Sequence, residues 1–135
     1  MLWNKHINEV LKSCYGVLRT LKSFKRFTPF KVRKALAEAL ILSRINYCNV
    51  VYGQLPAYLQ NRLQRVQNCA AGYVLGRYAS LSDNISLSWL PVVENIEFNT
   101  VRYVHQALNN DLWPDYLKVE TVRANRNLRS HNSGI

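Results

Sequence analysis

The chain has 135 residues, of which 48% are hydrophobic, and its formal net charge is +10 at pH 7. This length suits a single domain with a hydrophobic core, and the apolar content argues against wholesale disorder. Glu38 and Arg44 interrupt the longest apolar stretch, residues 35–51, so no segment reaches the roughly 18–20 residues of a membrane span.

The first predicted element is a helix over residues 3–25. Its apolar residues recur at steps of three and four and therefore share one face; they are Ile7, Val10, Leu11, Cys14, Leu18 and Leu21. A separate basic stripe recurs every seven residues, at Lys5, Lys12, Arg19 and Arg26. Tyr15 and Phe27 lie beside this stripe and are the better candidates for stacking on nucleic-acid bases, although packing is the commoner role of such rings.

A second helix is predicted to begin at Thr28 and Pro29. Thr28 is a suitable N-cap, and Pro29 loses no hydrogen bond in the first turn. Helical spacing continues through Val32, Ala35, Leu36, Ala39, Leu40 and Ser43. Because residues 35–42 are almost wholly apolar, we expect this helix to be buried on most sides and to end near Gly53.

A third helix is predicted from Leu55 and Pro56 to about Tyr78. Its apolar stripe comprises Leu59, Leu63, Val66, Ala70 and either Tyr73 or Val74, with Arg62 and Arg65 on the outer side. Gly72 and Gly76 each disfavour helix by about 1 kcal/mol relative to Ala. An early end to this helix is therefore expected.

The rest of the chain is predicted to hold one further long helix. Residues 78–88 are polar and indicate a loop with at most one short turn. Pro91 begins the fourth helix, to about Asn109, whose predicted inward residues are Ile96, Thr100, Tyr103, Val104, Ala107 and Leu108. Pro114 begins a short turn, and residues 118–135 indicate a poorly ordered polar tail. The predicted fold is all-α: a bundle of about four main helices over residues 1–117.

The three cysteines, Cys14, Cys48 and Cys69, are odd in number and far apart in the sequence. This spacing is neither a disulfide framework nor a zinc pattern. Each lies among apolar neighbours, where a free cysteine usually acts as a small buried hydrophobe. We therefore expect an intracellular, reducing location, nuclear or cytoplasmic.

The positive charge is concentrated at the start of the chain. Residues 1–34 hold nine basic residues and one acidic residue, Glu9, and so account for +8 of the net charge of +10. Such asymmetry indicates an acidic partner, either nucleic acid or an anionic membrane surface. A solvated helix face is the plainer alternative. The nine basic residues are Lys5, Lys12, Arg19, Lys22, Lys25, Arg26, Lys31, Arg33 and Lys34.

Residues that converge for catalysis are scarce in this sequence. The glycines are isolated, so no phosphate-binding loop is predicted, and the three histidines lack partners at metal-ligand spacing. The acidic pairs Glu94/Glu97 and Asp111/Asp115 come close to a two-metal pattern, but each lies at a helix start, where acids complement the helix dipole. We therefore predict no catalytic residue, no metal ligand and no cofactor in this chain.

A series of motifs follows along nearly the whole chain: WNKHI at 3–7, SRINYCNVVYGQLP at 43–56, LQRVQNCAA at 63–71, LSWLPVVENIEF at 87–98, PDYL at 114–117 and LRS at 128–130. Together they resemble the C-terminal part of reverse transcriptases from non-LTR (LINE-type) retrotransposons, particularly the jockey-like group. The corresponding family segments include W-x-x-H-I, S-R-L-D-Y-C-N followed by Y-G-x-L-P, L-Q-R-V-Q-N-x-A-A, and L-x-W-L-P-V followed by I-x-F. Any one motif is weak, but the ordered set is fairly specific.

The resemblance implies a non-catalytic, thumb-like fragment of an RNA-directed DNA polymerase. The family's palm, with its paired aspartates and Mg²⁺, would lie upstream and act as a partner domain. Two positions depart from the family pattern: Gly72 stands where Arg is usual, and Asn46 where Asp is frequent. The missing Arg weakens the case that the third helix binds phosphate.

The charge and the resemblance agree on a nucleic-acid partner, an RNA–DNA hybrid or duplex DNA. A Lys/Arg stripe on a rigid helix neutralises phosphates without reading bases, so binding is expected to tolerate any sequence and to weaken with salt. The predicted nucleic-acid-binding residues are Lys5, Lys12, Arg19, Lys22, Lys25, Arg26, Lys31, Arg33, Lys34 and Arg65.

Three alternatives stay open at the level of sequence. A helix-turn-helix module would read bases from one exposed helix, and the only suitable cluster is Gln60, Asn61, Gln64, Gln67 and Asn68. A protein-interaction domain would use the basic face to bind an acidic protein. A retroelement remnant would have no selected function.

Overall fold

The structure, a computed structural model, describes residues 2–47, 49–112 and 114–117. Within these ranges the elements are helical and no strand is present, so the predicted all-α fold is confirmed. The chain divides into two compact units, Met1–Thr100 and Val101–Ile135. The predicted tail, residues 118–135, lies outside the described residues.

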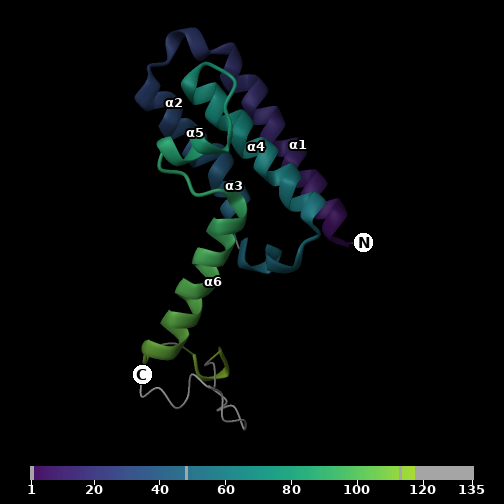
Figure 1. The fold of residues 1–135 in the computed structure, drawn as a ribbon, viewed down its shortest axis with the longest axis vertical. Coiled ribbons are helices and arrows are strands. Elements are labelled where there is room, and N and C mark those ends of the chain that lie inside the picture. The colour runs from purple at the N-terminus through teal and green to yellow at the C-terminus, as the bar shows by residue number, and fades with distance from the viewer. Residues whose placement is uncertain (1, 48, 113, 118–135) are drawn as a thin grey trace. The chain divides into compact units, whose positions relative to one another are not determined.

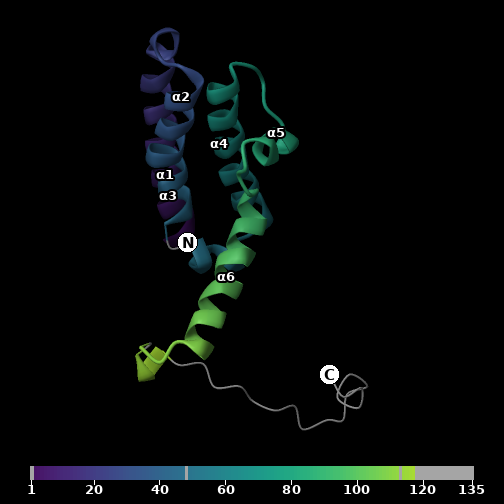
Figure 2. The same ribbon diagram turned by 90° about the vertical axis from the view of Figure 1, so that its left-hand side faces the viewer.

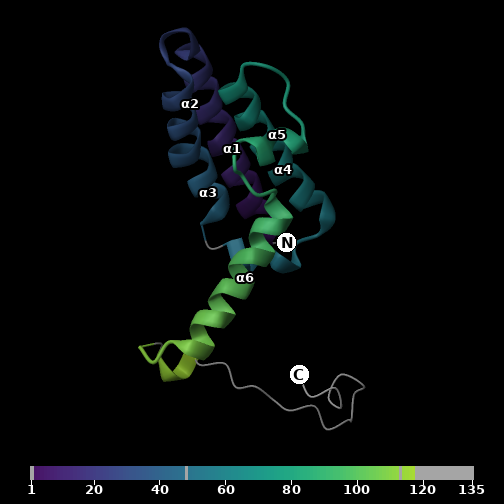
Figure 3. The same ribbon diagram turned by 60° about the vertical axis from the view of Figure 1, so that its left-hand side comes forward.

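The first unit is built around two long helices, α1 (Leu2–Ser23) and α4 (Ala57–Leu75). They lie side by side and contact each other along much of their length (Figures 1 and 3). A second helical segment consists of α2 (Phe30–Ala37), a π-helical turn (Glu38–Leu42) and α3 (Ser43–Asn46) (Figure 2). Its α2 part contacts α4, and the π-helical turn and α3 contact α1. The core lies between these segments.

The predicted face of α1 is confirmed. Its buried side chains are Ile7, Leu11, Cys14, Leu18 and Leu21, with Val10 partly buried beside them. The hydrophobic effect selects this face because the apolar residues recur with the helical period. After α1 the chain makes a short 3-10 turn, Lys25–Phe27, and the Phe27 ring is 83% exposed.

The predicted start of the second helix is early by one residue. Helix α2 begins at Phe30 with Pro29 at the cap position. The Thr28 hydroxyl does not cap it, because it donates backward to the carbonyl oxygens of Phe24 and Lys25, at 3.3 and 3.2 Å. Thr28 therefore closes the preceding turn.

The predicted burial and end of this segment are also wrong. Its buried residues are Ala37, Ile41, Leu42 and Ile45, whereas Val32 and Leu40 are exposed. An almost unbroken apolar run does not show which side of the helix is buried. The π-helical turn also changes which residues of the run share one face. The segment ends at Asn46, and a separate 3-10 helix (Asn49–Gln54) precedes α4.

Helix α4 confirms the third predicted helix and its early end. Leu59, Leu63, Val66, Ala70, Tyr73 and Val74 are all buried. The helix stops at Gly76, whose φ of 76° is left-handed and whose N–H donates to the carbonyl of Gly72 at 2.9 Å. A residue with a Cβ is strained in this conformation, so glycine suits the cap.

The predicted loop at residues 78–88 contains a helix, α5 (Leu81–Ser86), which contacts α4. Asn84 is fully buried and donates to Asn68 at 2.6 Å and to the Ser80 carbonyl at 3.0 Å. Two bonds from α4 hold the chain beyond α5, because Gln67 donates to the Leu90 carbonyl and Gln64 accepts from the Val92 N–H. The polar residues here form a structural hydrogen-bond network. From the sequence alone, the same polar residues resemble a loop.

The last long helix, α6 (Val92–Asn109), starts one residue after the predicted Pro91 and ends at the predicted Asn109. In the first unit, Val92 and Ile96 are buried in the core. In the second unit, Ala107 is buried, but Tyr103, Val104 and Leu108 are each more than 40% exposed. The prediction that these three point inward is wrong, since helical spacing defines a face without showing that another element covers it.

Candidate nucleic-acid interface

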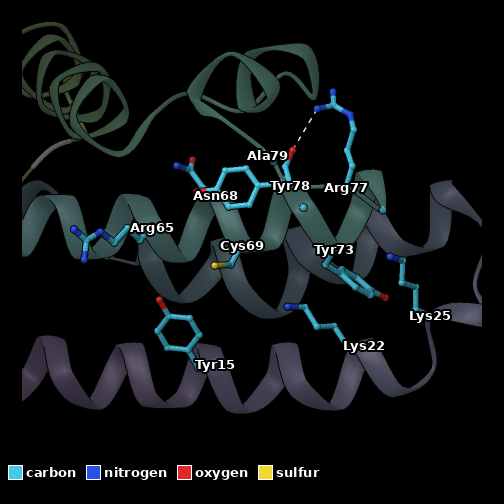
Figure 4. Close-up of a pocket in the computed structure, with 12 residues that line it drawn as sticks. Tyr15, Lys22, Lys25, Arg65, Asn68, Cys69, Tyr73, Arg77, Tyr78 and Ala79 are labelled. Atoms are coloured by element: carbon cyan, nitrogen blue, oxygen red, sulfur yellow. Dashed lines mark hydrogen bonds between the residues drawn. The ribbon is translucent and has the colours of Figure 1, made fainter.

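A hollow of about 680 Å³ lies between the C-terminal halves of α1 and α4 (Figure 4). We call it the α1–α4 groove. Its α1 side carries Tyr15 and Lys22, Lys25 follows from the 3-10 turn, and Arg65, Cys69 and Tyr73 come from α4. A smaller hollow shares Tyr15, Lys22 and Cys69 and adds Arg19. The basic side chains of two helices therefore meet here.

Small residues on α4 create the space. Cys69, Gly72 and Gly76 follow Arg65 at steps of four, three and four, and all line the groove. A Cβ at Gly72 would lie 3.0 Å from the Arg77 carbonyl oxygen, closer than side-chain carbons normally approach backbone. The close approach of the chain after α4 therefore requires a small residue at position 72. Because Gly72 has no side chain, it leaves space that forms part of the groove.

The groove is positively charged. Its lining includes Lys22, Lys25, Arg65 and Arg77 and contains no acidic residue. Burial, and then the nearby Cys69 thiol, raise the pKa of Tyr15, while Arg65 and Arg62 act in the opposite direction. The Tyr15 hydroxyl therefore stays protonated at neutral pH and is available as a hydrogen-bond donor.

Arg77 differs from the other three cations because it is already paired. Its guanidinium binds the carboxylate of Asp83, which also accepts the Ser80 N–H at 2.8 Å. The Arg77 hydrogen bond, followed by the Ser80 backbone bond, lowers the pKa of Asp83 from 3.8 to about 2. The pair anchors the start of α5 and leaves Lys22, Lys25 and Arg65 as the free charges of the groove lining.

This pair predicts a specific acid sensitivity. Because the folded pKa of Asp83 is depressed, its stabilising contribution is fully present above pH 3.8 and is lost as pH falls through about 2. In thermal melts across this pH window, the wild type is expected to lose stability relative to Asp83→Asn, which has no carboxylate to protonate. Parallel pH profiles for the two proteins would contradict the prediction.

The predicted binding residues fall into groups. Arg19, Lys22, Lys25 and Arg65 are brought together at the groove and its smaller neighbour. Lys5 and Lys12 are exposed on α1, but Lys12 lines a separate hollow that also contains Glu9. Arg26 and Lys31 are exposed on the 3-10 turn and on α2.

Arg33 and Lys34 are engaged within the protein. Arg33 donates to the Val74 carbonyl from Nε and Nη2, at 3.2 and 3.1 Å, and to the Thr28 carbonyl from Nη1 at 2.9 Å. The Lys34 amino group lies 3.8 Å from the Glu38 carboxylate. The geometry gives Arg33 a structural role at the end of α4, so it does not favour a phosphate contact by this residue.

Sequence reasoning did not single out Tyr73 or Arg62 as site residues. Tyr73 was predicted as core, and it is only 2% exposed, yet it also lines the groove. Arg62 is exposed one turn before Arg65 and acts electrostatically on Tyr15. One sequence signal could have identified this face of α4. It is the spacing of three and four residues between Arg62, Arg65, Cys69 and Gly72.

The polar cluster that would suit a helix-turn-helix module is largely committed to the fold. Gln67 is buried against the Leu90 carbonyl, and Asn68 accepts from both Gln64 and Asn84. Gln64 also accepts the Val92 N–H. These three side chains are engaged within the fold, so of the five candidate base readers only Gln60 and Asn61 lie outside this network, and Asn61 is exposed.

Over the described part of the chain, no group of three or more His, Cys, Asp or Glu side chains is arranged to hold a metal ion. No helix within the same ranges is long and apolar enough to cross a membrane. Cys14 is buried as predicted, whereas Cys69 is exposed, contrary to prediction, because it faces the groove. Cys48 lies outside the described residues. Comparison with protein-family models, curated proteins and solved structures gives no match to this chain.

Proposed function

We propose that this chain is a non-catalytic helical domain that binds template–primer nucleic acid through its phosphates, without reading base sequence. One observation carries the proposal: Arg19, Lys22, Lys25 and Arg65 converge on adjoining hollows whose linings contain no acidic side chain. Phosphates are the ligands that such an array suits best, because each cation releases condensed counterions when it binds the backbone.

The fold supports contact with phosphates in preference to bases. The cations belong to α1, the following turn and α4, which pack together through a shared buried core. Rigid elements hold charges at set positions along a backbone. With Gln64, Gln67 and Asn68 engaged internally, the face offers charge without base-edge recognition.

The resemblance to non-LTR retrotransposon reverse transcriptases supplies the biological setting of the proposal. In that setting the domain acts as a thumb-like region on an RNA–DNA hybrid or duplex DNA, inside the cell. The palm domain, with its Mg²⁺, would be the catalytic partner. The motifs at residues 43–56 and 63–71 support this proposed biological setting.

Salt dependence tests the proposal directly. If about four cations contact phosphates, the logarithm of the association constant should fall against the logarithm of salt concentration with a slope of about −3 to −4. Fluorescence anisotropy with hybrid and duplex oligonucleotides of unrelated sequences measures this slope. Similar slopes and affinities across sequences are expected. A slope near zero, or strong preference for one sequence, would overturn the proposal.

A further inference from the structure

The Tyr73 hydroxyl is a buried donor for which the structure shows no hydrogen-bond partner. The side chain is 2% exposed and forms part of the groove lining. Figure 4 shows its ring at the end of the groove, beside Lys22 and Lys25. A buried polar group without a partner is costly, and this one lies where two lysines raise the local positive potential.

The chemistry at this end of the groove suits a phosphate. Because the Tyr73 hydroxyl is buried, a phosphate oxygen would accept its hydrogen after neighbouring side chains shift, and the phosphate charge would be balanced by Lys22 and Lys25. Both lysines have flexible stems, and the Lys25 amino group already lies within 3.5 Å of where a Cβ at Gly76 would stand. The glycine cap of α4 therefore leaves room for the lysine at the mouth of the groove.

The other end suits a flat, largely apolar group. Tyr15 is 45% exposed and faces the α4 wall formed by Cys69 and Arg65 (Figure 4). Aromatic and guanidinium surfaces stack on bases of any identity. The groove volume of about 680 Å³ lies in the range of small-ligand sites, about 300–1,000 Å³. A phosphate alone would occupy only one end of it.

We propose that the α1–α4 groove binds one unpaired nucleotide, with its 5′-phosphate held by Lys22, Lys25 and Tyr73 and its base against Tyr15. This inference rests on the proposed nucleic-acid interface and deepens it. In that setting the nucleotide belongs to an unpaired end of a bound strand, and a free nucleotide carries the same chemistry. The groove then anchors a strand end while the surrounding cations contact the duplex phosphates.

Titration calorimetry on the full chain tests the ligand class. Adenosine 5′-monophosphate is expected to bind at least about tenfold more tightly than adenosine or inorganic phosphate, because only the nucleotide engages both ends of the groove. Equal affinity for inorganic phosphate would overturn the inference in favour of a simple anion site. Absence of nucleotide binding would overturn it outright.

Two substitutions test the assigned contacts. Tyr73→Phe should weaken nucleotide binding about 10- to 100-fold, as expected for a hydrogen bond to a charged group, without lowering the thermal unfolding midpoint. Tyr15→Ala should weaken it by a similar factor through lost stacking. Tyr47→Phe, on an exposed ring outside the groove, is the matched control and should leave affinity unchanged. Unaltered binding by Tyr73→Phe would overturn the phosphate assignment.

A final comparison separates this inference from the interface on which it rests. A duplex with a 5′-phosphorylated one-nucleotide overhang should bind more tightly than a blunt duplex, and Tyr73→Phe should remove the difference. Salt-dependent duplex binding without any overhang effect would overturn the groove assignment and leave the interface standing. Binding of the free nucleotide without duplex binding would overturn the interface and the assignment to a strand end.

Discussion

The triple variant Lys22→Gln/Lys25→Gln/Arg65→Gln is expected to bind a duplex with a 5′-phosphorylated one-nucleotide overhang about 100-fold more weakly than the wild type at about 0.15 M salt. Each phosphate contact contributes about 0.9 to the salt slope, which at this salt concentration corresponds to about fivefold in affinity. Removing three contacts therefore lowers the slope by about 2.7. Anisotropy titrations over a salt series measure both quantities.

A matched variant separates this local effect from the general loss of charge. Lys5→Gln/Lys12→Gln/Lys31→Gln removes the same three charges from exposed positions outside the groove lining. We expect it to weaken binding by less than about tenfold, through long-range electrostatics alone. Equal losses in the two triple variants would show that the whole basic surface binds diffusely and that the groove has no special role.

Arg33→Gln is expected to lower the free energy of unfolding by about 3 kcal/mol, because hydrogen bonds to charged groups contribute about 1.5–3 kcal/mol each. Arg33 joins the start of α2 to the end of α4 through the Val74 carbonyl. Helix-end carbonyls lack intrahelical partners, and a cation there also complements the helix dipole. Urea denaturation followed by circular dichroism measures the loss.

The same variant decides between a structural and a phosphate-binding role for Arg33. The salt slope of Arg33→Gln should match that of the wild type at temperatures where both are folded. Lys31→Gln, an exposed residue on the same helix, serves as the stability control and should change unfolding by no more than about 0.5 kcal/mol. A normal stability with a reduced slope for Arg33→Gln would reverse our assignment.

Part of this protein follows from its sequence alone. The all-α class and the buried faces of α1 and α4 are readable because apolar residues at steps of three and four must share a helix face, and burial of that face drives folding. The early end of α4 is readable for a local reason, because Gly72 and Gly76 disfavour helix, and the structure places that end at the left-handed cap of Gly76. The concentration of charge in residues 1–34 is likewise a property of the sequence.

Tertiary structure decided the rest, because the deciding contacts join residues far apart in the chain. The exposed side of residues 35–42 depends on which neighbours pack against a segment that is almost wholly apolar. The polar stretch around Asn84 starts a helix at a local capping box of Ser80 and Asp83, and the bond from Asn84 to Asn68 then fixes that helix on α4. Arg33 and Lys22 cannot be distinguished as cations in the sequence. In the fold, Arg33 donates to the Val74 carbonyl, whereas Lys22 lines the groove. The spacing of Tyr73 in the sequence predicts only a core residue. Its hydroxyl becomes a candidate hydrogen-bond donor to a phosphate because α4 packs against α1.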